Sequence, residues 1–424
     1  MRRRGAVGMI AGVAPTVRIP GLVLTEHEFQ VPLDHDRPAG ERITVFAREV
    51  ADPDGPDRPY LVFLQGGPGF EAPRPTGAPV GPGWLARALR EFRVLLLDQR
   101  GTGRSTPVET LPGRTPEQQA EYLTHFRADS IVRDAEWIRA ELGVDRWSVL
   151  GQSFGGFCAA TYLSIAPHGL REALFTGGVP PVGVHIDDVY RATYPTVLER
   201  NRRYYLRYPG DRDRVRRVVD LADEGRITLA NGDRLTSRRF RQLGNLLGDS
   251  DGAEHLHYLL ERDPLSFAFA HDVAERLPFP QRNPIYFVLQ EACYADGVVT
   301  NWSAQRVQPD DYAADPTLFT GEHAFPWMLD DCGGFAPLRE ATELLAKHEW
   351  PRLYDEAALR SCDVPCAAAM YAEDAFVDFR LGLATARMIP TMRYWVTNEF
   401  EHNGLRAAGG RVLDRILDLA RGRA

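Results

Sequence analysis

A serine, an acidic residue and a histidine occur in the order and in the settings that nucleophilic hydrolysis requires. Ser153 stands in Gly151-Gln152-Ser153-Phe154-Gly155, a G-x-S-x-G motif. A serine hydroxyl becomes a nucleophile when a histidine takes its proton and a carboxylate orients that histidine. Small residues around the serine permit the sharp turn that lifts its hydroxyl into a site. The motif alone is weak, because a plain glycine-rich turn or a phosphate-binding loop has the same pattern.

The base and the acid are expected after the last two apolar runs of the chain, residues 364–372 and 392–399. Among the 11 histidines, only His402 follows those runs, in the polar loop 398–404. The loop after the preceding run offers Glu373, Asp374 and Asp378. Asp374 is nearest to the end of that run and is our prediction for the acid, with Asp378 second. A surface histidine in a polar loop is the alternative for His402, but its position after the serine and the acid favours the catalytic interpretation.

Acyl transfer also needs preformed N–H donors for the developing oxyanion. One is expected to be the backbone N–H of Phe154, which follows the serine. The other is expected from the loop Gln65-Gly66-Gly67-Pro68-Gly69, where glycine leaves room for an inward N–H, and we predict Gly67. A simple turn is the alternative for this loop.

Parallel strands must position these residues at one edge of a sheet. The chain has a predicted strand pair at 26–33 and 42–50 and a helical pattern at 130–143. Short apolar runs predict further, buried strands. These runs are residues 60–65, 92–99, 146–151, 172–178, 364–372 and 392–399. Strands alternating with helices predict an α/β fold with a mostly parallel twisted sheet and helices on both faces.

A long segment interrupts this alternation of strands and helices. Residues 181–355 are predicted to be helical, with one possible strand at 285–290. We therefore predict a core in two parts, 1–180 and 356–424, with a helical cap inserted at 181–355.

Five motifs carry a family resemblance. They are QGGPG at 65–69, DQRGTGRS at 98–105, GQSFGGF at 151–157, YAEDAFVD at 371–378 and NEFEHNGLR at 398–406. Together they resemble the longer variety of the prolyl iminopeptidase (prolyl aminopeptidase) family of α/β-hydrolase serine peptidases. The resemblance implies an α/β-hydrolase core with a helical cap, and an enzyme that releases an N-terminal residue, preferentially proline, from peptides. It also implies that Asp98 and Arg100 are structural residues. Gln65 departs from the family, in which a histidine commonly precedes GGPG.

The resemblance further implies that cap glutamates bind the free α-ammonium of the substrate and that cap aromatic residues line a pocket for its side chain. Glu322 is the best match for an amine-binding residue, Glu291 is the next, and Glu340 is a weak third. For such a glutamate a solvated surface position is the alternative. The aromatic candidates, for which ordinary packing is equally favoured, are Phe325, Trp327, Tyr294 and Tyr286.

Composition restricts the partners. The formal net charge is −8, which argues against a nucleic-acid or an anionic-membrane partner. The substrates expected are peptides with a free N-terminus, and the oligomeric state is not predicted. The alternative is a related hydrolase with the same triad and another cap specificity: a tripeptidyl aminopeptidase, an esterase or a hydrolase of peptide-like natural products. A binding module of the same fold is disfavoured, because all three triad residues are present.

No cofactor or metal is expected. The single lysine, Lys347, argues against Schiff-base chemistry. His255 and His257 resemble a metal pair, but no further ligand accompanies them at a suitable spacing. The five cysteines lack paired spacings, which favours a reducing, cytoplasmic setting. Residues 1–15 resemble a signal peptide only faintly, and we expect neither a secretory signal nor a membrane span.

Overall fold

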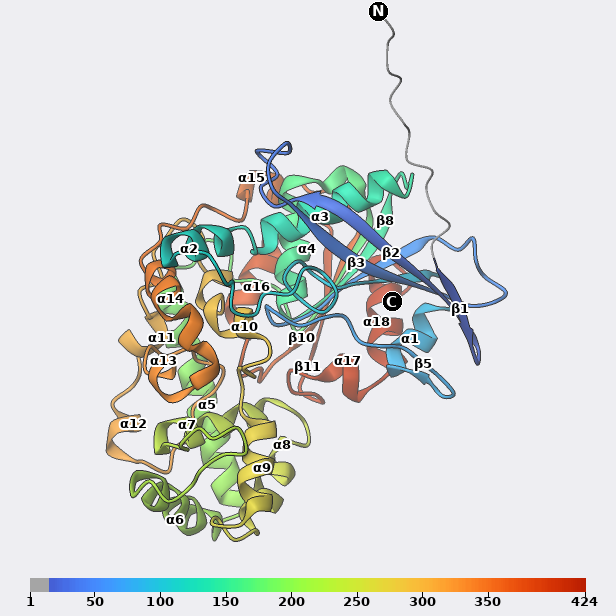
Figure 1. Cartoon of the computed structure of the whole chain (residues 1–424). Coiled ribbons are helices and arrows are strands. Elements are labelled where there is room, and N and C mark those ends of the chain that lie inside the picture. Colours follow the sequence, from blue (N-terminus) through green and yellow to red (C-terminus); the bar gives the residue numbers. More distant parts are fainter. Residues whose placement is uncertain (1–14) are drawn as a thin grey trace, which may run out of the picture.

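A nine-stranded sheet forms the centre of the molecule (Figure 1). The computed structural model describes residues 15–424, so the N-terminal segment weighed as a signal peptide lies outside the described residues. The strand order is β1-β2-β3-β7-β4-β8-β9-β10-β11. The first three strands are antiparallel, and the other six, from β7 to β11 in that order, are mutually parallel. The sheet is therefore mostly parallel, as predicted.

The predicted strands are confirmed within a few residues at each end. The antiparallel strands are β1 (Thr16–Ile19), β2 (Leu22–Pro32) and β3 (Arg42–Ala51). The parallel strands are β4 (Tyr60–Leu64), β7 (Arg93–Leu97), β8 (Trp147–Gln152), β9 (Leu170–Thr176), β10 (Cys366–Tyr371) and β11 (Met392–Thr397). A separate two-stranded ribbon consists of β5 (Thr76–Gly77) and β6 (Val80–Gly81).

Helices cover both faces of the sheet because the strand side chains alternate. In β4, Leu61 and Phe63 pack with α1 (Gly83–Ala88) and α18 (Gly410–Ala420). Val62 faces the other way. That second face is covered by α3 (Ala128–Glu141), α4 (Phe154–Ile165) and α16 (Phe379–Met388). Every residue of β4 and β8 is buried, which explains their continuous apolar character.

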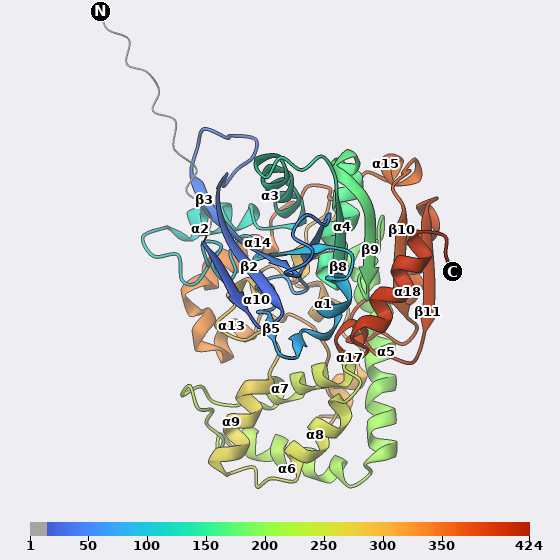
Figure 2. The same ribbon diagram turned by 90° about the vertical axis from the view of Figure 1, so that its right-hand side faces the viewer.

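The helical insertion, which we define as residues 177–365 between β9 and β10, has two parts. Its first part forms a lobe at one end of the molecule, with α6 to α9 gathered below the sheet in both views (Figures 1 and 2). This lobe has its own apolar core, which includes Phe240, Leu243 and Phe269. The second part packs into the main core, through residues such as Phe287 and Phe335. The insertion is thus anchored to the sheet domain along much of its length.

Most helices of the insertion are short, and α5 is the longest of those described. Those of the lobe are α5 (Ile186–Arg207), α6 (Asp211–Asp223), α7 (Ser237–Arg241), the 3-10 helix η2 (Gln242–Gly248), α8 (Gly252–Leu260) and α9 (Phe267–Arg276). Those that follow are α10 (Pro284–Val288), η3 (Glu291–Cys293), α11 (Ser303–Arg306), α12 (Asp311–Ala314), α13 (Met328–Asp331), η4 (Gly333–Leu338), α14 (Arg339–Ala346) and α15 (Glu356–Arg360). Outside the insertion lie α2 (Pro116–Thr124), η1 (Pro167–Gly169) and α17 (Gly404–Ala407).

The predicted strand at 285–290 is wrong, because this run forms α10 instead. A short apolar run fits a buried helix as well as a buried strand, and all five residues of α10 are buried. Pro284 occupies the first turn, where its missing N–H costs no helical hydrogen bond. Between residues 15 and 424, no helix has both the length and the apolar character needed to cross a bilayer.

Candidate active site

Ser153 lies at a strained turn between β8 and α4. Its φ of 54° and ψ of −125° are unusual for a residue with a side chain. The neighbouring glycines make this turn possible, because a Cβ on Gly155 would overlap the carbonyl of Leu64 and a Cβ on Gly178 would overlap that of Ser153. The tight packing of strand and helix therefore holds the Ser153 hydroxyl at the end of the strand.

His402 connects Ser153 to Asp374. Its Nε2 lies 2.8 Å from Ser153 Oγ, and its Nδ1 lies 2.7 Å from Asp374 Oδ2. Because a carboxylate only accepts, Nδ1 of a neutral His402 donates to Asp374, and Nε2 is left to accept the serine proton. The other oxygen of Asp374 accepts the backbone N–H groups of Phe376 (2.8 Å) and Val377 (3.0 Å). The carboxylate is thus fixed from its own loop and directs one oxygen at His402.

Of the three acids proposed from the sequence, Asp374 is the one that reaches His402. Asp378 instead caps α16, accepting the N–H groups of Arg380 (2.9 Å) and Leu381 (3.0 Å). Glu373 pairs with Arg203. Burial by itself would lower the pKa of His402. The charge and hydrogen bond of Asp374, together with the charge of Glu322, outweigh this effect, so the pKa of His402 is raised.

Gly67 and Phe154, which we predict as oxyanion donors, both lie near Ser153. Gly67 has a φ of 133°, a conformation that favours glycine, and it lines the same cavity as Ser153. Phe154 is the first residue of α4, so its N–H is among those that the helix itself does not use. The neighbouring Gly66 approaches Ser153 so closely that a Cβ there would lie 3.0 Å from the Ser153 Cβ.

A cavity of about 340 Å³ opens over Ser153 and His402. Its walls combine the sheet domain with the helical insertion. From the sheet domain come Gln65, Gly66, Gly67, Phe70, Gln152, Phe376 and Arg406, and from the insertion Asn245, Asp249, Glu275, Arg276, Leu277, Pro278, Pro280, Tyr286 and Glu322. The cavity is of the size of small-molecule sites.

Glu322 places a carboxylate on the wall of this cavity. Burial raises its pKa to about 7, although the Tyr286 hydroxyl, which donates a hydrogen bond to Oε1, acts in the opposite direction. Glu322 is half-buried in this wall, and a carboxylate that is partly withdrawn from water gains more from a neighbouring cation than one in bulk water. The side chain is therefore suited to bind an ammonium group.

Among the other predicted substrate residues, Tyr286 lines the cavity, whereas Glu291, Phe325 and Trp327 do not. Glu291 lines a separate, very small cavity, and its Oε1 accepts the N–H of Ala304 at 2.8 Å. Phe325 and Trp327 stack on each other with 5.4 Å between ring centroids. They serve packing, since neither lines the catalytic cavity.

Two further candidates, Tyr294 and Glu340, lie outside the cavity lining. Tyr294 is buried behind the cavity, where its hydroxyl donates to the carbonyl of Phe376 at 3.2 Å. Glu340 is exposed on α14. Neither side chain lines the cavity.

Phe70 and Phe376 were missed by sequence reasoning. The Phe376 ring packs edge-on against His402, with 4.8 Å between centroids, and Phe70 packs against Tyr286 at 4.9 Å. A signal was available, because Phe70 directly follows the QGGPG motif and Phe376 lies two residues after Asp374. The loops that carry the catalytic groups thus also supply apolar walls.

Buried polar residues near the site stabilise the loops. Asp98 is fully buried and accepts from Arg74 and from the N–H groups of Ala72 and Arg104. Gln65, the departure from the family pattern, contributes its carbonyl to a hydrogen bond from the side chain of Gln99. These contacts support the structural interpretation of the 98–105 motif.

No group of three or more metal-ligating side chains occurs among the described residues. His257, part of the suspected metal pair, hydrogen bonds to Asp211 at 2.8 Å and stacks on Tyr208 at 4.0 Å. Its partner His255 is exposed. His257 therefore packs the lobe of the insertion.

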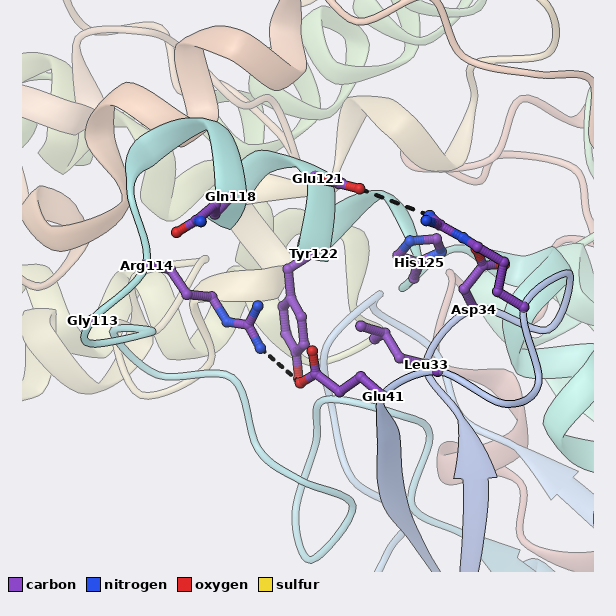
Figure 3. A pocket seen from close by; sticks show the side chains of 11 residues that line it. Leu33, Asp34, Glu41, Gly113, Arg114, Gln118, Glu121, Tyr122 and His125 are labelled. Atoms are coloured by element: carbon purple, nitrogen blue, oxygen red, sulfur yellow. Dashed lines mark hydrogen bonds and ion pairs between the residues drawn. The ribbon is translucent and has the colours of Figure 1, made fainter.

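A second cavity, of about 490 Å³, lies apart from Ser153 (Figure 3). Its charged side chains pair with one another: Arg114 with Glu41 at 2.7 Å, and Arg37 with Glu121 at 3.8 Å. It shares no residue with the catalytic cavity and contains no serine or cysteine. Its chemistry does not suit nucleophilic hydrolysis.

Known proteins resemble this chain over most of its length. Residues 59–319 match the α/β hydrolase fold family. A proline iminopeptidase from Aeromonas sobria is 46% identical, over 95% of this chain and 98% of that protein. The proline iminopeptidase aneH from Aspergillus aculeatus is 34% identical, over 94% of each chain.

Proposed function

Because the chain belongs to the proline iminopeptidase family of α/β hydrolases, and is thus an aminopeptidase, we propose that it removes N-terminal residues, preferentially proline, through a Ser-His-Asp triad. The hydrogen-bonded series Asp374–His402–Ser153, opening into a cavity that also holds Glu322, is the observation that carries this proposal. The substrates are peptides with a free N-terminus.

The proposed reaction has two steps. In the first, Ser153 Oγ attacks the carbonyl carbon of the first residue while His402 Nε2 takes the hydroxyl proton, and Asp374 stabilises the resulting imidazolium. The N–H groups of Phe154 and Gly67 bind the oxyanion. His402 then gives its proton to the leaving nitrogen as the C–N bond breaks. In the second step, water attacks the acyl carbon while His402 takes a proton from it. The bond to Ser153 Oγ then breaks, His402 returns the proton to Oγ, and the free amino acid leaves.

Glu322 is proposed to select for the free amine. An aminopeptidase must reject a continuing chain, and a buried carboxylate does this by pairing with the α-ammonium. The insertion brings Glu322 and Tyr286 over the sheet edge, which supports residues 181–355 as a cap domain that defines the substrate site. Phe70, Phe376 and Leu277 offer apolar contacts that suit a pyrrolidine ring.

The direct test replaces Ser153 by alanine. We expect S153A to lose release of proline from a prolyl arylamide and labelling by a fluorophosphonate, while Ser361→Ala, which changes an exposed serine, leaves both unchanged. Turnover retained by S153A would refute the mechanism. Equal cleavage of prolyl and N-acetylprolyl arylamides by the wild type would refute recognition of the amine, and favour an esterase or another hydrolase.

A reducing, cytoplasmic setting is part of the proposal. The five cysteines are all buried free thiols, and no disulfide is needed to stabilise a core of this size. Fractionation of the source cells, followed by detection of the protein, tests this setting, and recovery from the extracellular medium would contradict it.

A further inference from the structure

We infer that Arg200 of the helical insertion is a positioning residue. It fixes the loop that carries Asp374 (the acid loop) relative to the loop that carries His402 (the base loop). This inference rests on the proposed triad and adds a residue to it. Arg200 lies on α5, and its side chain is only 10% exposed. It touches neither Ser153 nor the cavity wall.

The guanidinium of Arg200 bridges the residues that directly precede Asp374 and His402. Its Nη1 donates to Glu401 Oε1 at 2.8 Å, and its Nη2 donates to the other oxygen of Glu401. The same Nη2 donates to the backbone carbonyl of Glu373 at 2.5 Å. One rigid, planar group thus ties the two loops together, with one link to backbone and a bidentate link to a carboxylate.

Besides this bridge, the Phe376 ring packs against His402 with 4.8 Å between centroids, and hydrogen bonds join the two loops. They leave neighbouring parallel strands, β10 and β11, where the N–H of Ala372 donates to the carbonyl of Thr397 at 2.9 Å. Beyond that point, the hydrogen bond from His402 to Asp374 crosses between them. Small shifts of either loop would lengthen this bond, and displacement of a catalytic group by about 1 Å can cost about 100-fold in rate.

The insertion also contacts the base loop from a second side. The N–H of His402 donates to the carbonyl of Gly248 at 3.0 Å, and Ser250 hydrogen bonds to Asn403 at 2.7 Å. Gly248 ends η2 and Ser250 lies two residues further on, so the loop 399–403 contacts the insertion at this segment as well as at Arg200 of α5. The cap therefore sets the geometry of the catalytic base as well as the walls of the cavity.

Arg202 provides a matched control on the same helix. It is an exposed arginine whose one ion-pair partner among residues 15–424 is Glu199, at 2.7 Å, within α5. Replacing it by methionine removes a surface ion pair of the kind that contributes at most about 1 kcal/mol. It alters no contact with the catalytic loops.

The test compares Arg200→Met, Arg200→Lys and Arg202→Met. For R200M we expect fluorophosphonate labelling of Ser153 to slow by about 10- to 100-fold, and kcat on a prolyl arylamide to fall by a similar factor with KM changed less than about threefold. R200K retains the charge but not the fork, so an intermediate rate is expected. R202M should match the wild type.

A merely structural role would give another pattern. If Arg200 only attached the cap, R200M would unfold at lower temperature and show a raised KM, with a normal labelling rate in its folded fraction, and the inference would be overturned. Should R200M fail to fold, Glu401→Gln tests the same bridge, and its labelling rate is expected to fall as well. The double variant R200M/E401Q should be no slower than R200M, because both changes remove one interaction.

Labelling rates also separate this inference from the proposed function. They require only a reactive Ser153, and not recognition of proline or of a free amine. A wild type that is labelled but does not cleave prolyl arylamides would refute the proposed substrate, while the comparison of R200M with R202M would still decide the role of Arg200.

Discussion

Replacing Glu322 by glutamine tests the proposed recognition of a free amine. The substitution removes the negative charge while keeping the size of the side chain, and the amide oxygen can still accept the Tyr286 hydroxyl. In the native protein, burial raises the pKa of Glu322 to about 7. At about pH 8 the native carboxyl is therefore mostly ionised and ready to pair with an ammonium.

The size of the effect follows from this setting. Two unit charges about 4 Å apart interact by about 4 kcal/mol at an effective dielectric constant of about 20. Loss of one partner of a buried, hydrogen-bonded charge pair costs about 2–5 kcal/mol. A loss of about 2–4 kcal/mol corresponds to a fall of about 30- to 700-fold in kcat/KM, at about 1.4 kcal/mol for each factor of ten.

The assay measures kcat/KM on a prolyl arylamide between about pH 5.5 and 9. In the wild type, activity should fall as the pH drops through about 7, because protonation removes the charge of Glu322, and protonation of His402, whose pKa is raised, adds to this acid limb. In E322Q the limb should shift to lower pH, because only His402 titrates and the charge that helped to raise its pKa is gone.

Two controls make the result specific. Glu340→Gln alters an exposed glutamate and should leave kcat/KM unchanged. Fluorophosphonate labelling of Ser153 at pH 8 should differ little between E322Q and the wild type, since the reagent carries no ammonium. An E322Q enzyme that retains kcat/KM within about threefold at pH 8 would refute the assignment of Glu322 to the amine, given the expected loss of at least about 2 kcal/mol.

Two further substitutions separate catalytic from structural carboxylates. Asp374→Asn should lower kcat by about 10³- to 10⁴-fold through loss of the correct His402 tautomer. In the same assay Asp378→Asn should keep kcat, and it should lose at most about 1 kcal/mol of stability because a cap of α16 is weakened. Equal losses of kcat in the two variants would contradict the choice of acid. Burial raises the pKa of Glu291 to about 7, so the free energy of unfolding falls as the pH rises and the buried carboxyl must ionise. Between about pH 5.5 and 8, the free energy of unfolding measured in urea should fall by about 2 kcal/mol more for the wild type than for Glu291→Gln. A difference between the two proteins that does not change with pH would contradict an ionisable, buried Glu291.

The sequence was most informative where local rules and chain order act together. Continuous apolar runs predicted the buried strands β4, β7 and β8, because a strand covered on both faces must be apolar throughout. Ser153, Asp374 and His402 could be selected because each follows a strand, and parallel strands end at the same edge of the sheet. The run 285–290 was the exception, because its apolar residues fit either kind of buried element and Pro284 decided for a helix.

The substrate site depended much more on tertiary structure. Glu322 and Glu291 are both glutamates of the insertion whose pKa values are raised to about 7, yet only Glu322 lines the cavity with Ser153. Likewise, Phe325 and Trp327 lie in an aromatic segment next to Glu322 but stack on each other. Proximity in sequence says little about the direction of a side chain where short helices and turns follow one another.

The sequence by itself thus determined the fold class and the order of the proposed catalytic residues, since apolar periodicity, glycine at tight turns and chain order can be read along the chain. Only the tertiary structure decided which acid meets His402, which glutamate faces the cavity, and that Arg200 joins residues 373 and 401. These contacts link residues far apart in the chain, and their geometry depends on how the insertion packs across the edge of the sheet.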